Sequence, residues 1–118
     1  MSETDISRGI RETLARLGVI VWRNQAGTMQ GGRVHLAPKG TPDLIGVLPG
    51  GRFLGLEVKR PGQKPTEVQL QWQRDLIAKG AVCAVVTSVQ EAVDVVRTAM
   101  LPAVIEYEHP KPKLKVVK

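Results

Sequence analysis

The chain has 118 residues, a hydrophobic fraction of 42% and a formal net charge of +6 at pH 7. This length fits one domain, and the apolar share is enough for a globular core. No apolar run approaches the roughly 20 residues that span a bilayer, the first residues are polar and unlike a secretory signal, and a single cysteine excludes an internal disulfide and a cysteine-rich zinc site. We therefore expect no membrane contact and a cytoplasmic location. The positive charge favours polyanionic partners, nucleic acid first.

The predicted elements begin with a helix over residues 5–17, where apolar residues recur at helical spacing. A strand rich in β-branched residues follows over 19–23. Residues 24–40 hold four glycines and predict a long loop with a short strand near 34–36. Loops of this length in compact domains are often functional.

Two strands over 43–48 and 52–59 then form the clearest hairpin in the chain. A capped helix over 66–79 follows, with Gly80 closing it. Residues 81–87 are apolar without alternation, which predicts a central, buried strand. A last helix covers residues 88–100.

The predicted order is α-β-β-β-α-β-α, an α/β fold with a mixed sheet flanked by helices. Residues 1–100 form the predicted domain. Residues 101–118 are rich in proline and lysine and predict a basic, partly flexible tail, with an edge strand near 104–107.

The hairpin carries the main argument about function. If the loop is the three residues Pro49–Gly51, then Leu48 pairs with Arg52, and Asp43 lies directly opposite Glu57. Directly opposed residues share one face of a sheet, with their Cβ atoms about 5 Å apart. Residue 59, a lysine, points the same way, whereas the other face carries residues suited to a core: Leu44, Leu54, Leu56 and Val58.

Two carboxylates and an ammonium group therefore converge on one face. Paired carboxylates repel, and a divalent cation removes that conflict. Mg²⁺ is commonly held by one or two carboxylates, and a nearby lysine can orient water or offset phosphate charge. The set suits phosphodiester hydrolysis. The alternative is a solvated hairpin with unrelated charges, and a loop of two or four residues would separate the carboxylates.

The segment Gly40-Thr41-Pro42-Asp43-Leu44-Ile45-Gly46, followed by Glu57-Val58-Lys59, closely resembles the PD-(D/E)XK nuclease signature. More narrowly, the chain resembles the VRR-NUC family over roughly residues 5–98. That family includes small phage nucleases and the catalytic domain of a eukaryotic DNA-repair nuclease. Further matching positions are Trp22-Arg23-Asn24, Lys39, Gly50-Gly51-Arg52, Arg60, Gln69, Trp72 and Val85-Val86-Thr87-Ser88.

The resemblance implies a role for each matching residue. Asp43 and Glu57 would bind Mg²⁺, or Mn²⁺ in its place, with the backbone carbonyl of Val58 as a further ligand. Lys59 would be the catalytic lysine.

Two further positions have competing interpretations. Gln69 matches a helix glutamine near the family's site, but Thr66-x-x-Gln69 is also a capping box, in which Gln69 bonds to the Thr66 backbone. The family carries an acidic residue on its first helix, and counting back from Trp22 puts that position on Asp5, with Glu3 close by. Asp5 would then be a metal or water-shell ligand; the alternative is a first-turn carboxylate favoured by the helix dipole.

Four basic residues are candidates for phosphate contacts: Arg23, Lys39, Arg60 and Lys64. Each neutralised phosphate would steepen the salt dependence of binding. Any of them can equally be a solvated charge.

The expected function is a metal-dependent DNA endonuclease. Small nucleases of this family resemble Holliday-junction resolvases that work as homodimers, which implies selectivity for four-way junctions, a homodimer and a phage or bacterial source. The alternatives are a restriction-like or flap-directed nuclease with the same centre, and a nucleic-acid-binding module without catalysis.

Overall fold

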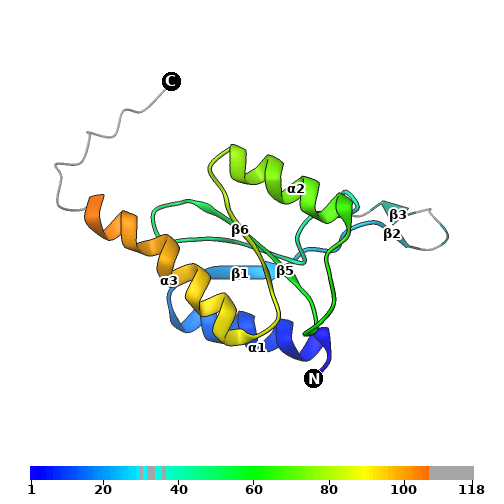
Figure 1. Cartoon of the computed structure of the whole chain (residues 1–118), viewed down its shortest axis with the longest axis horizontal. Coiled ribbons are helices and arrows are strands. Elements are labelled where there is room, and N and C mark those ends of the chain that lie inside the picture. The colour runs from blue at the N-terminus through cyan, green and yellow to red at the C-terminus, as the bar shows by residue number, and fades with distance from the viewer. Residues whose placement is uncertain (30, 32–33, 36, 107–118) are drawn as a thin grey trace.

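The computed structural model describes residues 1–29, 31, 34–35 and 37–106, and three helices cover a four-stranded sheet (Figure 1). The elements in chain order are α1 (Glu3–Arg16), β1 (Ile20–Arg23), β2 (Thr28–Met29), β3 (Val34–His35), β4 (Leu44–Val47), β5 (Phe53–Val58), α2 (Glu67–Ala78), β6 (Val82–Val86) and α3 (Val89–Glu106).

The sheet has the strand order β1-β4-β5-β6. The first three strands are antiparallel neighbours, and β6 runs parallel to β5. The predicted α/β class and mixed sheet are confirmed. The glycine-rich stretch contains one more strand than we predicted, because β2 and β3 pair as a separate hairpin that projects from the domain (Figure 1).

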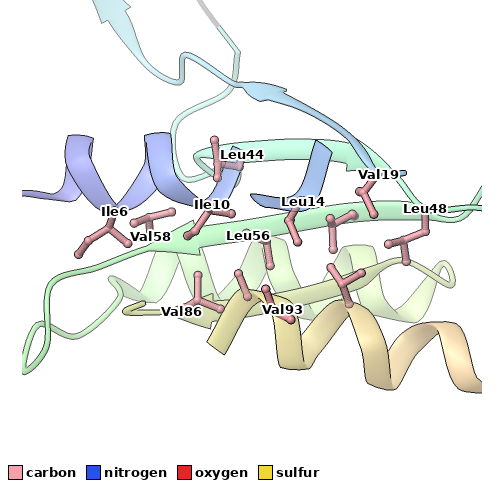
Figure 2. Packing of buried hydrophobic residues seen from close by; sticks show 13 residues of the cluster. Ile6, Ile10, Leu14, Val19, Leu44, Leu48, Leu56, Val58, Val86 and Val93 are labelled. Carbon is pink, nitrogen blue, oxygen red and sulfur yellow. The ribbon is translucent and has the colours of Figure 1, made fainter. Parts of the chain in front are cut away.

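The core lies between the sheet and the pair α1 and α3, which pack against each other on one face, whereas α2 lies on the other (Figures 1 and 2). The four β4 and β5 residues assigned to the core are all buried, as predicted. Full burial of one such side chain contributes roughly 1.5–3 kcal/mol. The helices contribute Ile6, Ile10, Leu14, Ala92, Val93 and Val96 to the same cluster.

The predicted position of residues 81–87 at the centre of the sheet is wrong. The strand that they form, β6, is an edge strand beside β5, and most of its side chains are only partly buried. Its continuous apolar sequence has another cause, since both α2 and α3 contact it. A strand covered on both faces is apolar throughout wherever it lies in the sheet.

The edge strand predicted near 104–107 is also wrong, because α3 continues through residue 106 and across the predicted domain boundary at 100. Residues such as Val104 and Ile105 favour strands only where a sheet surface receives them. Here they belong to the last turn of α3, a helix whose earlier turns are packed against the core. Residue 107 and the rest of the predicted flexible tail lie outside the described residues. No helix in the described part of the chain combines the length and apolarity needed to cross a bilayer.

Candidate active site

The β4–β5 hairpin has the predicted register. Leu44 pairs with Leu56, and each further pair has residue numbers that sum to 100. The Leu48 amide donates to the Arg52 carbonyl at 2.9 Å, so the turn is the three-residue loop 49–51. One step beyond the last pair, the same register sets Asp43 opposite Glu57 at the end of the hairpin.

Asp43 is held by backbone groups of both neighbouring strands. The Val58 amide donates to Asp43 Oδ2 at 2.8 Å, and the Asn24 amide donates to the Asp43 carbonyl at 2.7 Å. The Asn24 side chain also donates to Thr41 Oγ1 at 2.8 Å and to the Pro42 carbonyl at 2.9 Å. Asn24 therefore fixes the segment that carries Asp43, a role that its place beside Trp22-Arg23 in the resemblance did not specify.

Gly40 and Pro42 hold the other side of this segment. Gly40 has a φ of +91°, and a Cβ there would overlap the Val68 side chain on α2. Pro42 lies so close to Gly55 of β5 that a Cβ on Gly55 would come within 2.8 Å of its ring. The glycine before Thr41-Pro42-Asp43 is thus required by close packing as well as by backbone conformation.

Glu57 is 1% exposed, and α2, which carries Gln69, lies over its face of the sheet (Figure 1). Gln69 Nε2 donates to Glu57 Oε1 at 2.7 Å, and Lys59 Nζ lies 3.9 Å from the same oxygen. The predicted capping box is present, and Gln69 also lies beside Glu57. Its Oε1 accepts from the Thr66 amide at 2.8 Å in the predicted capping box, which directs its Nε2 at Glu57.

Burial, and then the negative charge and hydrogen bond of Asp43, together raise the pKa of Glu57 to about 8. Lys59 opposes this increase only in part. The protonated form of Glu57 is therefore favoured near neutral pH, as expected for a buried carboxyl group beside a second negative charge and without a cation between them.

A pocket of about 130 Å³ adjoins this pair, between the first turns of α1 and the end of β1. It is lined by Glu3, Thr4, Ser7, Arg11, Arg23, Asn24, Asp43 and Val58. Of the two acidic residues near the start of α1, Glu3 faces this pocket, and its charge contributes to the raised pKa of Glu57.

Asp5 is exposed and closes a capping box with Ser2 instead. Its Oδ2 accepts from the Ser2 hydroxyl at 2.9 Å, and this bond lowers the pKa of Asp5. The helical periodicity of the sequence distinguishes Glu3 from Asp5. At about 100° per residue, Glu3 is in line with the buried Ile6 and Ile10, whereas Asp5 points away from them.

The donor set fits a hard divalent cation. Asp43 and Glu57 offer carboxylate oxygens, and Val58 lines the same pocket as Asp43. Mg²⁺ usually takes one or two carboxylates and keeps several waters. Within the described residues, no cluster of three or more His, Cys, Asp or Glu side chains could hold a metal ion, so the fit is to a two-carboxylate site.

The four predicted phosphate-binding residues have different local settings. Arg23 lines the pocket. The Lys39 carbonyl accepts from the Trp72 indole at 3.1 Å, which ties the loop before the site to α2. Arg60 and Lys64 are exposed in the loop after β5, where the Arg60 amide donates to Gln63 Oε1.

No family model matches the chain. A solved structure described as a "VRR_NUC domain" superposes with a TM-score of 0.61 at 28% sequence identity, covering 80% of this chain and 94% of the other. The chain has the fold of a VRR_NUC domain. The chain is also similar in sequence to "Putative nuclease p44" of Acyrthosiphon pisum secondary endosymbiont phage 1, with 43% identity over 42 residues. That match covers 36% of this chain and 45% of the phage protein, so the chain spans under half of the phage protein's length.

Proposed function

We propose that this VRR-NUC domain is a metal-dependent DNA endonuclease whose centre is Asp43, Glu57 and Lys59. The observation that carries the proposal is the convergence of these side chains at the end of one hairpin, with Glu57 buried beneath Gln69. The similarity to a VRR_NUC domain and to a phage protein named as a nuclease supports hydrolysis of nucleic acid.

In this proposal Asp43, Glu57 and the Val58 carbonyl hold Mg²⁺ or Mn²⁺. A cation held there supplies positive charge beside the phosphoryl oxygens and a more acidic water. The Val58 amide orients the Asp43 carboxylate, and Gln69 orients that of Glu57. Lys59 brings its ammonium group next to Glu57, where it can orient water and offset charge on the transition state.

We assign the role of the family's helix acid to Glu3. It lines the pocket with Asp43, and a carboxylate in that pocket suits a hydrogen bond from the water shell of the metal. Asp5 as a ligand stays a prediction that its exposed position in the capping box does not support.

We further propose that the substrate is branched DNA, such as a four-way junction, and that the enzyme is a homodimer. Two centres related by two-fold symmetry suit a symmetric junction. One apolar row favours self-association. Ile20, Val47 and Phe53 lie side by side on three strands, and Trp22 shares their face. All four side chains are at least 37% exposed.

A cleavage assay tests these proposals. The substrates are a labelled four-way junction, a 5′-flap and a linear duplex, each incubated with Mn²⁺ or Mg²⁺ and then with EDTA. We expect metal-dependent cleavage that Glu57→Ala and Lys59→Ala reduce by 100-fold or more, roughly the effect of removing one transition-state contact. Lys79→Ala, which removes an exposed lysine at the end of α2, is the matched control.

Unchanged cleavage by Glu57→Ala or Lys59→Ala would refute the assigned centre. Binding of all three DNAs without cleavage would favour a non-catalytic binding module. Equal cleavage of linear duplex and junction would contradict branched-DNA selectivity and favour a restriction-like nuclease, and preferential cleavage of the flap would favour a flap-directed one.

A further inference from the structure

The pocket beside the carboxylate pair contains a cationic group that the proposed hydrolysis does not use. Arg11 lies on α1, one turn after Ser7 and two turns after Glu3, and all three side chains line the pocket. Residues four apart on a helix share a face. This arrangement directs the Arg11 side chain to the same cavity as Asp43.

Arg11 Nε is buried and has no hydrogen-bond partner within the described residues. Across those residues its guanidinium also forms no ion pair within 4.0 Å, whereas the neighbouring Arg8 lies 3.9 Å from Asp5. A buried donor without a partner costs about 1–3 kcal/mol, more when charged. A ligand that accepts this hydrogen bond would recover that free energy.

The charges that line the pocket define the ligand. Glu3 and Arg11 are eight residues apart on α1, about 12 Å along the helix axis. The pocket is therefore lined by the acidic Glu3 near the start of α1 and by the cationic Arg11 further along the same helix, and Arg23 adds a second positive charge. Arginine stays charged and presents a planar fork of donors that matches phosphate geometry. Two arginines attract a phosphate group, but the Asp43 carboxylate repels negative charge. A singly charged phosphodiester therefore fits this pocket better than a free phosphate dianion would.

The geometry points to Arg11 as a phosphate-binding residue that holds a backbone phosphodiester next to the one being cleaved, with Arg23 as its partner. The inference rests on the proposed function for the neighbouring centre. It adds a specific contact that would position the DNA strand relative to Asp43. Neither the hairpin register nor the resemblance pointed to Arg11.

The test is DNA binding by Arg11→Gln, with Ca²⁺ in place of Mg²⁺ and with the best-cleaved DNA as probe. We expect Kd to rise about tenfold or more, in line with loss of a charge-assisted hydrogen bond. The slope of log K against log salt should fall by about 0.9, the value for one phosphate contact. Arg8→Gln removes the same charge from an exposed part of the same helix and should leave that slope unchanged.

Two further measurements identify the contact itself. A series of DNAs is used in which each carries one neutral methylphosphonate at a different backbone position. At one of these positions the methylphosphonate should weaken DNA binding by the wild type and have no effect on binding by Arg11→Gln. Arg11→Lys should keep the salt slope and recover only part of the affinity, since a lysine cannot reproduce the planar fork. The midpoint of thermal unfolding should not fall in Arg11→Gln, because that variant removes a buried group without a partner.

If Arg11→Gln behaves like Arg8→Gln in Kd and salt slope while the wild type cleaves DNA, the inference about Arg11 fails and the proposed function stands. If the salt slope falls as expected but the wild type does not cleave, the proposed function fails and the phosphate contact remains. A lower unfolding midpoint with an unchanged salt slope would show that Arg11 is structural and would also overturn the inference.

Discussion

Glu57 is a carboxyl group with almost no contact with water, and its neighbours only partly compensate for that loss. Gln69 donates one hydrogen bond to it, and the Lys59 ammonium group is 3.9 Å away, beyond hydrogen-bond distance. Asp43 adds a second negative charge on the same face. In the metal-free protein the neutral form of Glu57 is therefore favoured, whereas a divalent cation would favour the ionised form.

This balance predicts how the stability of the metal-free protein depends on pH. The folded-state pKa of Glu57 is raised to about 8 from an ordinary value of 4.5, so between these values the folded state binds more protons than the unfolded state. The free energy of unfolding should therefore fall as pH rises from about 5 to 8, by at most about 1.4 kcal/mol per pH unit. Urea unfolding in EDTA across this pH range measures this decline in the free energy of unfolding.

Glu57→Gln is the control, because its side chain cannot ionise. Its free energy of unfolding should lack this decline with pH. A wild-type stability that increases from pH 5 to 8 in EDTA would contradict the raised pKa.

A second prediction at this scale separates Glu3 from Asp5. Glu3→Ala should reduce metal-dependent cleavage by tenfold or more and leave stability nearly unchanged, because Glu3 lines the pocket. Asp5→Ala should leave cleavage close to that of the wild type and lower stability by about 1 kcal/mol, because it removes the reciprocal bonds with Ser2. Single-turnover cleavage and thermal unfolding of both variants decide it. The reverse pattern would restore the original assignment of Asp5.

At the scale of elements, the site depends on how α2 meets the loop before β4. The capping box between Thr66 and Gln69 begins α2 at the point where Gln69 reaches Glu57. Gly40 lets that loop pass against Val68 of the same helix. The packing of α2 therefore couples Glu57 to the segment that carries Asp43.

Gly40→Ala tests this coupling. The change should destabilise the protein by about 2 kcal/mol or more, since it adds a Cβ at positive φ and forces it against α2. It should also lower cleavage of the folded protein. Gly80 has a similar φ of +98°, but a Cβ there would have nothing within 4 Å. Gly80→Ala should therefore lose only the stability that the positive φ accounts for, and it should retain cleavage. Thermal unfolding and cleavage below the unfolding transition measure both effects, and equal losses in the two variants would contradict the close packing.

At the scale of the whole molecule, the apolar row over β1, β4 and β5 is the feature that most favours assembly. Light scattering on the purified protein should give a mass twice that of one chain. Phe53→Ser combined with Ile20→Ser should shift the mass toward a monomer, because both side chains lie in the row. Ile77→Ser removes an exposed apolar side chain from α2 and should leave the dimer intact. A wild-type monomer at micromolar concentration would contradict the homodimer.

Much of this molecule follows from local rules. The spacing of Ile6, Ile10 and Leu14 was enough to predict the helix α1. The pair Thr66 and Gln69 was enough to predict where α2 begins. The three-residue turn determined the hairpin register, because side chains alternate strictly along a strand. That register alone set Asp43 opposite Glu57 and the leucines toward the core.

Other features depended on contacts between residues far apart in sequence. The edge position of β6 follows from which strand it pairs with, and its apolar sequence is the same for a central strand. The burial of Glu57 beneath Gln69, and the pocket between Glu3, Arg11 and Asp43, exist only once helices pack on the sheet. Sequence patterns report which face of an element is apolar. They do not report which neighbour covers it, and that neighbour sets the solvation and charge of the site.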